Sequence, residues 1–259
     1  MIFFSFLFFI TAFLYACVGF GGGSTYNALL VLGDADYKIL PLVSLICNLI
    51  VVSGGVWRFS KNRHIRIKKI LPWVFLSVPA AWVGGRINIP EFIFVGILGC
   101  SLFISSLQML WPAKPKHLLD MEQKNISSSI DFLPPVIGGG LGFLAGLTGI
   151  GGGIFLAPIL HILNWDNSKN IAGTCSLFIL VNSLAGLLGQ IMKLNESDLL
   201  LSLSSYWLLF PSVLLGGQIG SLMGAERLNT EMIKKLTALL ILYVALRLLF
   251  RFGGMVRIF

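Results

Sequence analysis

The chain has 259 residues, of which 56% are hydrophobic and only 12% are charged, and its formal net charge is +8. Its mean hydropathy of +0.88 is too high for a soluble domain of this length, so the chain belongs in a lipid bilayer. Eight membrane-spanning helices would use about 160 residues and leave about 100 for loops, which excludes a folded extramembrane domain and a nucleic-acid-binding module.

Ten apolar segments follow one another along the chain, and two of them are short. They cover residues 2–18, 24–33, 39–57, 70–85, 92–111, 133–150, 154–163, 171–192, 199–223 and 232–250. The pieces at 24–33 and 154–163 would span roughly half a bilayer at about 1.5 Å per residue. The basic interval at 58–69 is predicted to be a surface loop. The pattern predicts an all-α polytopic membrane protein with about eight spanning helices.

The two halves of the chain repeat each other around a polar stretch. The run GFGGG at 19–23 recurs as GIGGG at 149–153, an offset of 130 residues. A proline followed five residues later by Gly-Gly occurs at Pro79 and again at Pro211, an offset of 132. Two ordered matches at nearly one offset favour a duplication over chance. We therefore divide the chain into a first transmembrane repeat (1–111), a polar linker loop (112–132) and a second transmembrane repeat (133–259).

These motifs resemble the TauE/SafE family of sulfite exporter-like anion permeases. The resemblance rests on the two glycine runs, the two Pro-x4-Gly-Gly motifs and the AGTCS stretch at 172–176, and it covers nearly the whole chain. Residues 146–158 match the family pattern best, whereas residues 42–44 read LVS where a Gly-Thr-Ser-like run is typical. The resemblance implies a secondary transporter for sulfite or an organosulfur acid that works by alternating access. Composition and charge alone indicate only that the substrate is an anion.

The charges of corresponding loops favour an inverted repeat. Residues 58–69 carry six Lys or Arg, whereas their counterpart at 193–198 carries Lys193 beside Glu196 and Asp198. Because Lys and Arg collect in cytoplasmic loops, opposite charge bias indicates opposite sides of the membrane. A parallel repeat, in which each broken helix crosses the membrane once, is the alternative.

Each glycine run is expected to break the first helix of its half, because glycine costs about 1 kcal/mol relative to alanine inside a helix. Half-helices starting near Ser24 and Ile154 would then point free N–H groups and positive dipole ends at a cavity between the repeats. No Asp or Glu falls inside an apolar segment, so this site favours an anion over a cation. The glycines spaced by four at 138, 142 and 146 indicate close helix packing instead.

The substrate-binding candidates are the glycines of the two runs and polar residues near them in sequence or inside apolar segments. They are Gly21, Gly22, Gly23, Ser24, Asn27, Asn48, Thr148, Gly151, Gly152, Gly153, Thr174, Ser176 and Asn182. Thr25, Ser44 and Ser183 are further polar groups that could complete the site. Hydrogen bonding between helices is the alternative role for the two deep amides, Asn48 and Asn182.

Two ionisable residues have possible roles outside the glycine runs. Arg86 follows a Gly-Gly pair and could hold a sulfonate or sulfite through two hydrogen bonds, although an arginine at a helix end often extends to the lipid headgroups. His161 is the histidine within an apolar piece, where it could carry a proton with the substrate or lie at the membrane interface.

Two other functional classes remain as alternatives. Ser24 and His161 could form the nucleophile and base of an intramembrane serine protease, but Ile154 replaces the serine in the second half and that mechanism has no use for a duplicated glycine run. A non-transporting membrane assembly protein is the other alternative. We expect a transporter and not an enzyme.

The remaining expectations concern cofactors and location. The four cysteines lie in apolar stretches without a C-x-x-C pair, so they predict packing residues, and neither a metal nor another cofactor is expected. The expected partners are a small anionic substrate and the lipid bilayer, and the sequence leaves the oligomeric state open. The expected location is the cell membrane, which is the inner membrane in a bacterium.

Overall fold

The computed structural model describes residues 2–110, 133–163, 165–193, 204–226 and 230–256, and the regular secondary structure in these ranges is entirely helical. The predicted linker at 112–132 lies outside them. The helices are α1 (Ile2–Cys17), α2 (Gly23–Leu32), α3 (Leu40–Lys61), α4 (Ile67–Arg86), α5 (Glu91–Leu110), α6 (Leu133–Thr148), α7 (Gly153–Ile162), α8 (Ser168–Ile191), α10 (Leu209–Glu226) and α11 (Thr230–Val256).

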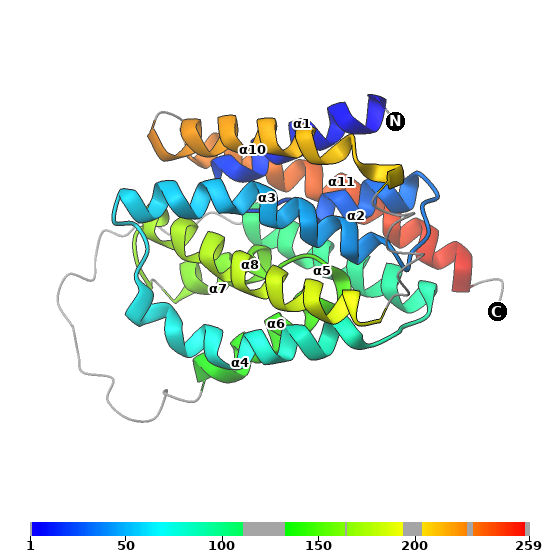
Figure 1. The fold of residues 1–259 in the computed structure, drawn as a ribbon, viewed down its shortest axis with the longest axis horizontal. Coiled ribbons are helices and arrows are strands. Elements are labelled where there is room, and N and C mark those ends of the chain that lie inside the picture. Colours follow the sequence, from blue (N-terminus) through cyan, green and yellow to red (C-terminus); the bar gives the residue numbers. More distant parts are fainter. Residues whose placement is uncertain (1, 111–132, 164, 194–203, 227–229, 257–259) are drawn as a thin grey trace.

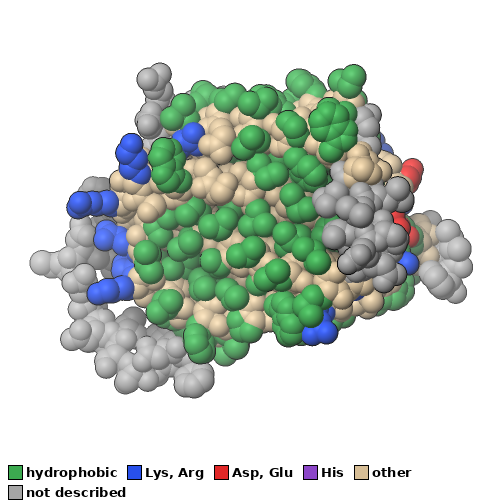
Figure 2. Space-filling model, in the orientation of Figure 1, with side chains coloured by type: hydrophobic (Ala, Val, Ile, Leu, Met, Phe, Trp, Pro, Cys, Tyr) green, Lys and Arg blue, Asp and Glu red, His purple; other side chains and the backbone are tan. Residues whose placement is uncertain are grey.

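Several helices suit a membrane by length and composition. Among the described residues, α3, α4, α8 and the stretch Glu91–Gln108 of α5 are long and apolar enough to cross a bilayer. Figure 2 shows a broad apolar face with Lys and Arg gathered at one end of the molecule. The prediction of an all-α polytopic membrane protein is confirmed at this level.

Two predicted boundaries are wrong. The basic interval at 58–69 is mostly helical, because α3 continues to Lys61 and α4 begins at Ile67. Arg and Lys are good helix formers, and positive charge in the last turn of α3 complements the helix dipole. The apolar piece at 199–223 is not one helix, since residues 207 and 208 form a turn before α10. Cys100 is exposed, whereas the other three cysteines are buried as expected.

Glycines bring helices of different halves into close contact. An added Cβ at Gly138, Gly142 or Gly146 of α6 would overlap successive backbone carbonyl oxygens of α4. The same holds for Gly216, Gly220 and Gly224 of α10 against α1. In both pairs the residue numbers at successive contacts increase along both helices, so the paired helices are parallel. The four-residue spacing of small residues allows this approach, as it does in other membrane helix pairs.

The two central helices, α3 and α8, run in opposite directions. Gly55 of α3 faces Ser176 of α8, while Leu45 lies beside Gly186. Figure 1 shows α1 and α10 along one edge of the bundle, α4 and α6 along the opposite edge, and α3 and α8 between them. Helices α5 and α11 are also antiparallel, because Gly96 meets Phe252 and Gly99 meets Leu249.

The short helix α2 folds back along α1. Tyr15 is hydrogen-bonded to Thr25, Phe8 stacks on Tyr26, and an added Cβ at Gly33 at the end of α2 would contact Phe4. The first half therefore makes a hairpin whose turn, at residues 18–22, lies between α1 and α2. The turn at 149–152 separates α6 from α7 in the same way along the chain. These two turns, called here the first and second break, position the candidate site.

Candidate functional site at the two glycine breaks

Both breaks use a left-handed glycine to start a short helix. Gly22 precedes α2 with a φ of 89°, and Gly152 precedes α7 with a φ of 78°. Side chains other than glycine rarely adopt this conformation, so the consecutive glycines are needed at these positions. An added Cβ at Gly22 would lie 2.8 Å from the Tyr26 ring, and one at Gly152 would lie 3.0 Å from Phe178.

The two breaks lie against each other, and Asn48 of α3 joins them. An added Cβ at Gly23 would lie 2.8 Å from the Gly149 carbonyl oxygen. The Asn48 Oδ1 atom accepts a 2.8 Å hydrogen bond from the Gly23 N–H. Its Nδ2 atom donates to the carbonyl oxygens of Ile150 at 3.1 Å and Gly149 at 3.4 Å. Asn48 is fully buried, so one amide satisfies backbone groups of both breaks.

Further polar contacts cross between the halves. The Ser176 Oγ atom of α8 donates to the Gly19 carbonyl oxygen at 2.7 Å. The Asn27 Nδ2 atom of α2 donates to the carbonyl oxygen of Thr148 at the end of α6. A helix of each half therefore donates a hydrogen bond to the backbone of the other half, at the break or directly before it.

Polar side chains surround the start of α2. The Tyr15 Oη atom lies 2.6 Å from Thr25 Oγ1 and 3.3 Å from Ser24 Oγ, and the Ser44 Oγ atom donates to the Gly23 carbonyl oxygen at 2.8 Å. Ser24, proposed as a protease nucleophile, therefore has a tyrosine hydroxyl beside it. The sequence did not single out Tyr15, because only the hairpin brings it to α2.

The start of α7 consists of apolar residues, and its first backbone N–H groups have no described hydrogen-bond acceptor. Within the described ranges, no hydrogen-bond acceptor is found for the N–H groups of Gly153 and Ile154, the first two residues of α7. The Ser183 Oγ atom of α8 is fully buried and has no hydrogen-bond partner among the described residues. It lies 2.9 Å from the position of an added Cβ at Gly151. The second break thus combines backbone donors with an unpaired hydroxyl.

The charge around the breaks is favourable to an anion. The carboxylates with described side chains are Asp34, Asp36, Glu91 and Asp166, and all of them lie in connections between helices or at a helix end. Both short helices direct their positive ends toward the breaks. No group of three His, Cys, Asp or Glu that could hold a metal occurs among the described residues.

Four predicted residues make no described hydrogen bond to the backbone of the breaks. Asn182 accepts a hydrogen bond from Ser77 of α4 and donates to the carbonyl oxygen of Phe178, so it lies in the contact between α4 and α8. Arg86 is exposed at the end of α4, with its guanidinium carbon 4.8 Å from the centroid of the Trp82 ring. His161 lies in the last turn of α7. Thr174 is buried in α8, and its hydroxyl has no partner within the described ranges.

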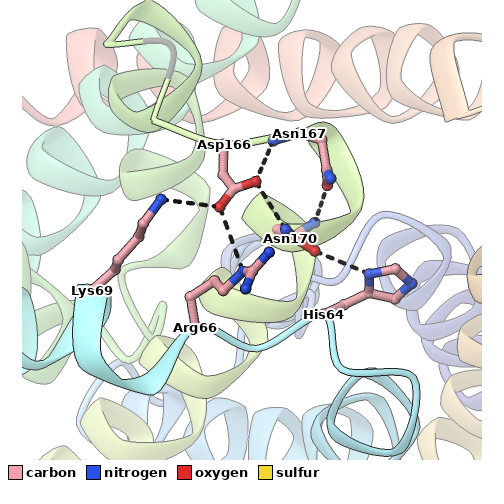
Figure 3. A network of polar contacts seen from close by, with 6 residues as sticks. All are labelled: His64, Arg66, Lys69, Asp166, Asn167 and Asn170. Carbon is pink, nitrogen blue, oxygen red and sulfur yellow. Dashed lines mark hydrogen bonds and ion pairs between the residues drawn. The ribbon is translucent and has the colours of Figure 1, made fainter. Parts of the chain in front are cut away.

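A polar cluster fixes the connection that follows α7 (Figure 3). Asp166 accepts a hydrogen bond from the Asn170 side chain at 2.8 Å and pairs with Lys69 of α4 at 3.4 Å. Partial burial opposes ionisation of this carboxyl, but hydrogen bonds from Asn167 and Asn170, together with Lys69, hold the pKa of Asp166 below its usual value. The His64 Nδ1 atom lies 3.0 Å from Asn170 Oδ1, which links the α3–α4 connection to the same cluster.

The end of α2 has a different anchor. Arg251 of α11 donates to the carbonyl oxygen of Val31 at 2.6 Å and pairs with Asp34 at 3.0 Å. It also lies 3.5 Å from Glu91 at the start of α5. A cation at the C-terminal end of a helix is favourable because of the helix dipole. The end of α2 is therefore held by Arg251, and the connection after α7 is held by the Asp166 cluster.

Comparisons with known proteins agree with the family resemblance. The family model described as Sulfite exporter TauE/SafE matches residues 4–248. The chain is also similar to the "Probable membrane transporter protein y4hK" of Sinorhizobium fredii, with 32% identity over 247 residues that cover 93% of this chain and 95% of the relative. No solved structure gives a significant match.

Proposed function

The chain belongs to the TauE/SafE family and is a multi-pass transporter of the cell membrane; from this premise we propose that it carries a small anion bound at the two glycine breaks. The observation that carries the proposal is the second break. There the N–H groups of Gly153 and Ile154 start a helix, and the Ser183 hydroxyl, which has no partner among the described residues, lies against Gly151 two residues earlier. No described carboxylate lies in the break. Such a helix start favours an anion.

We propose sulfite or an organosulfur acid as the substrate. A sulfur oxyanion has several acceptor oxygens on one atom, so neighbouring backbone donors and one hydroxyl can bind it together. The family description, which names a sulfite exporter, supports this substrate class. The glycines of both runs would allow the anion to approach the backbone, since a side chain there would fill the space.

Alternating access would come from two repeats of opposite orientation. The antiparallel pairs α3 with α8 and α5 with α11 support this proposal, because each pair joins corresponding helices of the two halves. A two-fold axis that relates antiparallel helices is perpendicular to them, and it therefore lies in the membrane plane. A substrate site between inverted repeats is a common design of secondary transporters.

Radiolabelled sulfite flux into liposomes containing the purified protein tests the function. We expect saturable uptake that unlabelled organosulfur acids compete for and that inorganic cations do not. An intact protein that moves none of these anions would overturn the proposal and support the non-transporting assembly protein.

A matched pair of glycine variants tests the site in the same assay. Gly152→Leu places a side chain in the second break at a left-handed residue, and we expect uptake to be abolished. Gly140→Leu makes the same change on α6, where an added Cβ meets nothing within 4 Å, and we expect uptake close to the wild type. Wild-type uptake by Gly152→Leu would exclude the second break as the site.

A further inference from the structure

A second polar group lies between α3 and α10, toward the end of the molecule where Lys and Arg gather. The partly buried Arg58 of α3 donates from Nη1 to the Ser221 Oγ atom of α10, and Ser221 is fully buried. Because α3 and α10 belong to different halves, this contact crosses the interface that moves in an alternating-access mechanism.

The Arg58 charge is not balanced by a carboxylate within the described side chains. Asp166 pairs with Arg66 and Lys69, while Asp34 and Glu91 pair with Arg251. A guanidinium that is partly removed from water is favoured by an anionic partner, and a neutral hydroxyl supplies only part of that stabilisation. Among the described side chains, Arg58 is thus held by a neutral hydroxyl, and an anion at the same place would stabilise its charge further.

Small and polar residues connect Arg58 with the breaks. One turn before Arg58, an added Cβ at Gly54 would overlap the side-chain amide of Gln218 on α10. The neighbouring Gly55 faces Ser176, with 3.6 Å between an added Cβ and the Ser176 Oγ atom. That hydroxyl donates to the Gly19 carbonyl oxygen of the first break. Asn48 lies ten residues before Arg58 on α3, or about 15 Å along the helix.

The location of Arg58 also suits an anion that approaches from water. Figure 2 shows Lys and Arg side chains at one end of the molecule, and Figure 1 places the α3–α4 connection at that end. Lys61, one turn after Arg58, is exposed and lies over the Trp57 ring at 5.7 Å. Clustered positive charge concentrates anions near a surface, but Arg58 differs from Lys61 because its guanidinium reaches between two helices.

We propose that Arg58, Ser221 and Gln218 form a second anion-binding site, at which the substrate anion is held between the basic end of the molecule and the glycine breaks. The anion replaces Ser221 as the partner of the guanidinium, and the Gln218 amide supplies a further donor. This inference rests on the proposed function, because it assigns a second position to the same anion.

The test compares Arg58→Gln with Lys61→Gln, since both variants remove one positive charge from the last turns of α3. In the liposome assay we expect Arg58→Gln to raise the KM for sulfite about tenfold, the effect of losing one charge-assisted hydrogen bond. Lys61→Gln should change KM less than about twofold, as expected for an exposed charge. Equal KM values for the two variants would overturn the second site.

A second variant keeps the shape of the site and changes its charge. Gln218→Glu places a fixed carboxylate one turn before Ser221 on α10, and it should raise KM several-fold by competing with the anion for Arg58, whereas Gln218→Met should have a smaller effect. An unchanged KM in Gln218→Glu would also overturn the proposal. Absence of anion uptake by the intact wild-type protein would refute the proposed function instead, so the two failures are distinguishable.

Discussion

The first and second breaks have the same glycine run but differ in the helix that follows. The first break leads into Ser24, Thr25, Tyr26 and Asn27, whereas the second leads into Ile154, Phe155, Leu156 and Ala157. In the first break the Gly23 N–H group donates to Asn48, while its counterpart at Gly153 has no acceptor among the described residues. The two breaks therefore share a backbone geometry but differ in the side chains and hydrogen bonds around it.

We propose that this difference gives the two breaks different roles. Around the first break, the hydroxyls of Tyr15, Thr25 and Ser44 form hydrogen bonds within the protein. Tyr26 Oη and Asn27 Oδ1 have no partner among the described residues. Around the second break, the N–H groups of Gly153 and Ile154 and the Ser183 hydroxyl have no partner among the described residues, whereas of the first two N–H groups of α2 only that of Ser24 has none. The repeat in the sequence predicts equal contributions from both halves, whereas we propose the second break as the main anion contact because its Gly153 N–H group has no acceptor among the described residues.

The largest expected effect comes from a negative charge at the start of α7. Ile154→Asp should lower anion affinity by more than about tenfold relative to Ile154→Asn, because a carboxylate repels the substrate and competes for the positive helix end. The matched pair Ser24→Asp and Ser24→Asn should differ less, since the Gly23 donor is already occupied. Anion affinity is measured by titration after size-exclusion elution confirms folding. Equal effects in the two halves would show that both breaks contact the anion alike.

The sequence predicts the local parts of this arrangement better than the contacts between them. Apolar segment lengths and glycine runs place the starts of the short helices within one residue of those observed at Gly23 and Gly153. By contrast, the roles of Tyr15 and Arg251 depend on helices that meet only after folding. A single sequence carries no local signal for such pairings. Asn48 and Asn182 are both amides within apolar segments, so hydrophobic patterning cannot show that Asn48 joins the breaks while Asn182 lies in a contact between helices.

An intermediate effect is expected from the amide that joins the breaks. Asn48→Ala removes the acceptor of the Gly23 N–H group and the donor to two carbonyl oxygens, so it should destabilise the protein by about 1 to 3 kcal/mol and also weaken anion binding. Asn182→Ala removes a buried amide of the same size from the α4–α8 contact. It should lower the melting temperature to a similar extent and leave anion affinity nearly unchanged. Equal affinity losses would mean that Asn48 acts only through stability.

The smallest expected effect separates ligand binding from stability. The Ser183 hydroxyl has no partner in the part of the chain that the structure describes, so Ser183→Ala removes no described hydrogen bond and relieves an unsatisfied buried group. The melting temperature should therefore stay the same or rise slightly. If the hydroxyl donates to the anion, loss of a hydrogen bond of about 0.5 to 1.5 kcal/mol should weaken affinity roughly two- to twelvefold.

Ser24→Ala is the control for Ser183→Ala in the other half. Its hydroxyl already lies 3.3 Å from the Tyr15 hydroxyl, and Tyr15 has Thr25 as a closer partner at 2.6 Å. The change should thus cost little stability and leave anion affinity within about twofold of the wild type, because that hydroxyl has a partner within the protein. Comparison of the two alanine variants isolates the hydroxyl that has no such partner. If Ser24→Ala lowered affinity and Ser183→Ala did not, the assignment of the two breaks would have to be reversed.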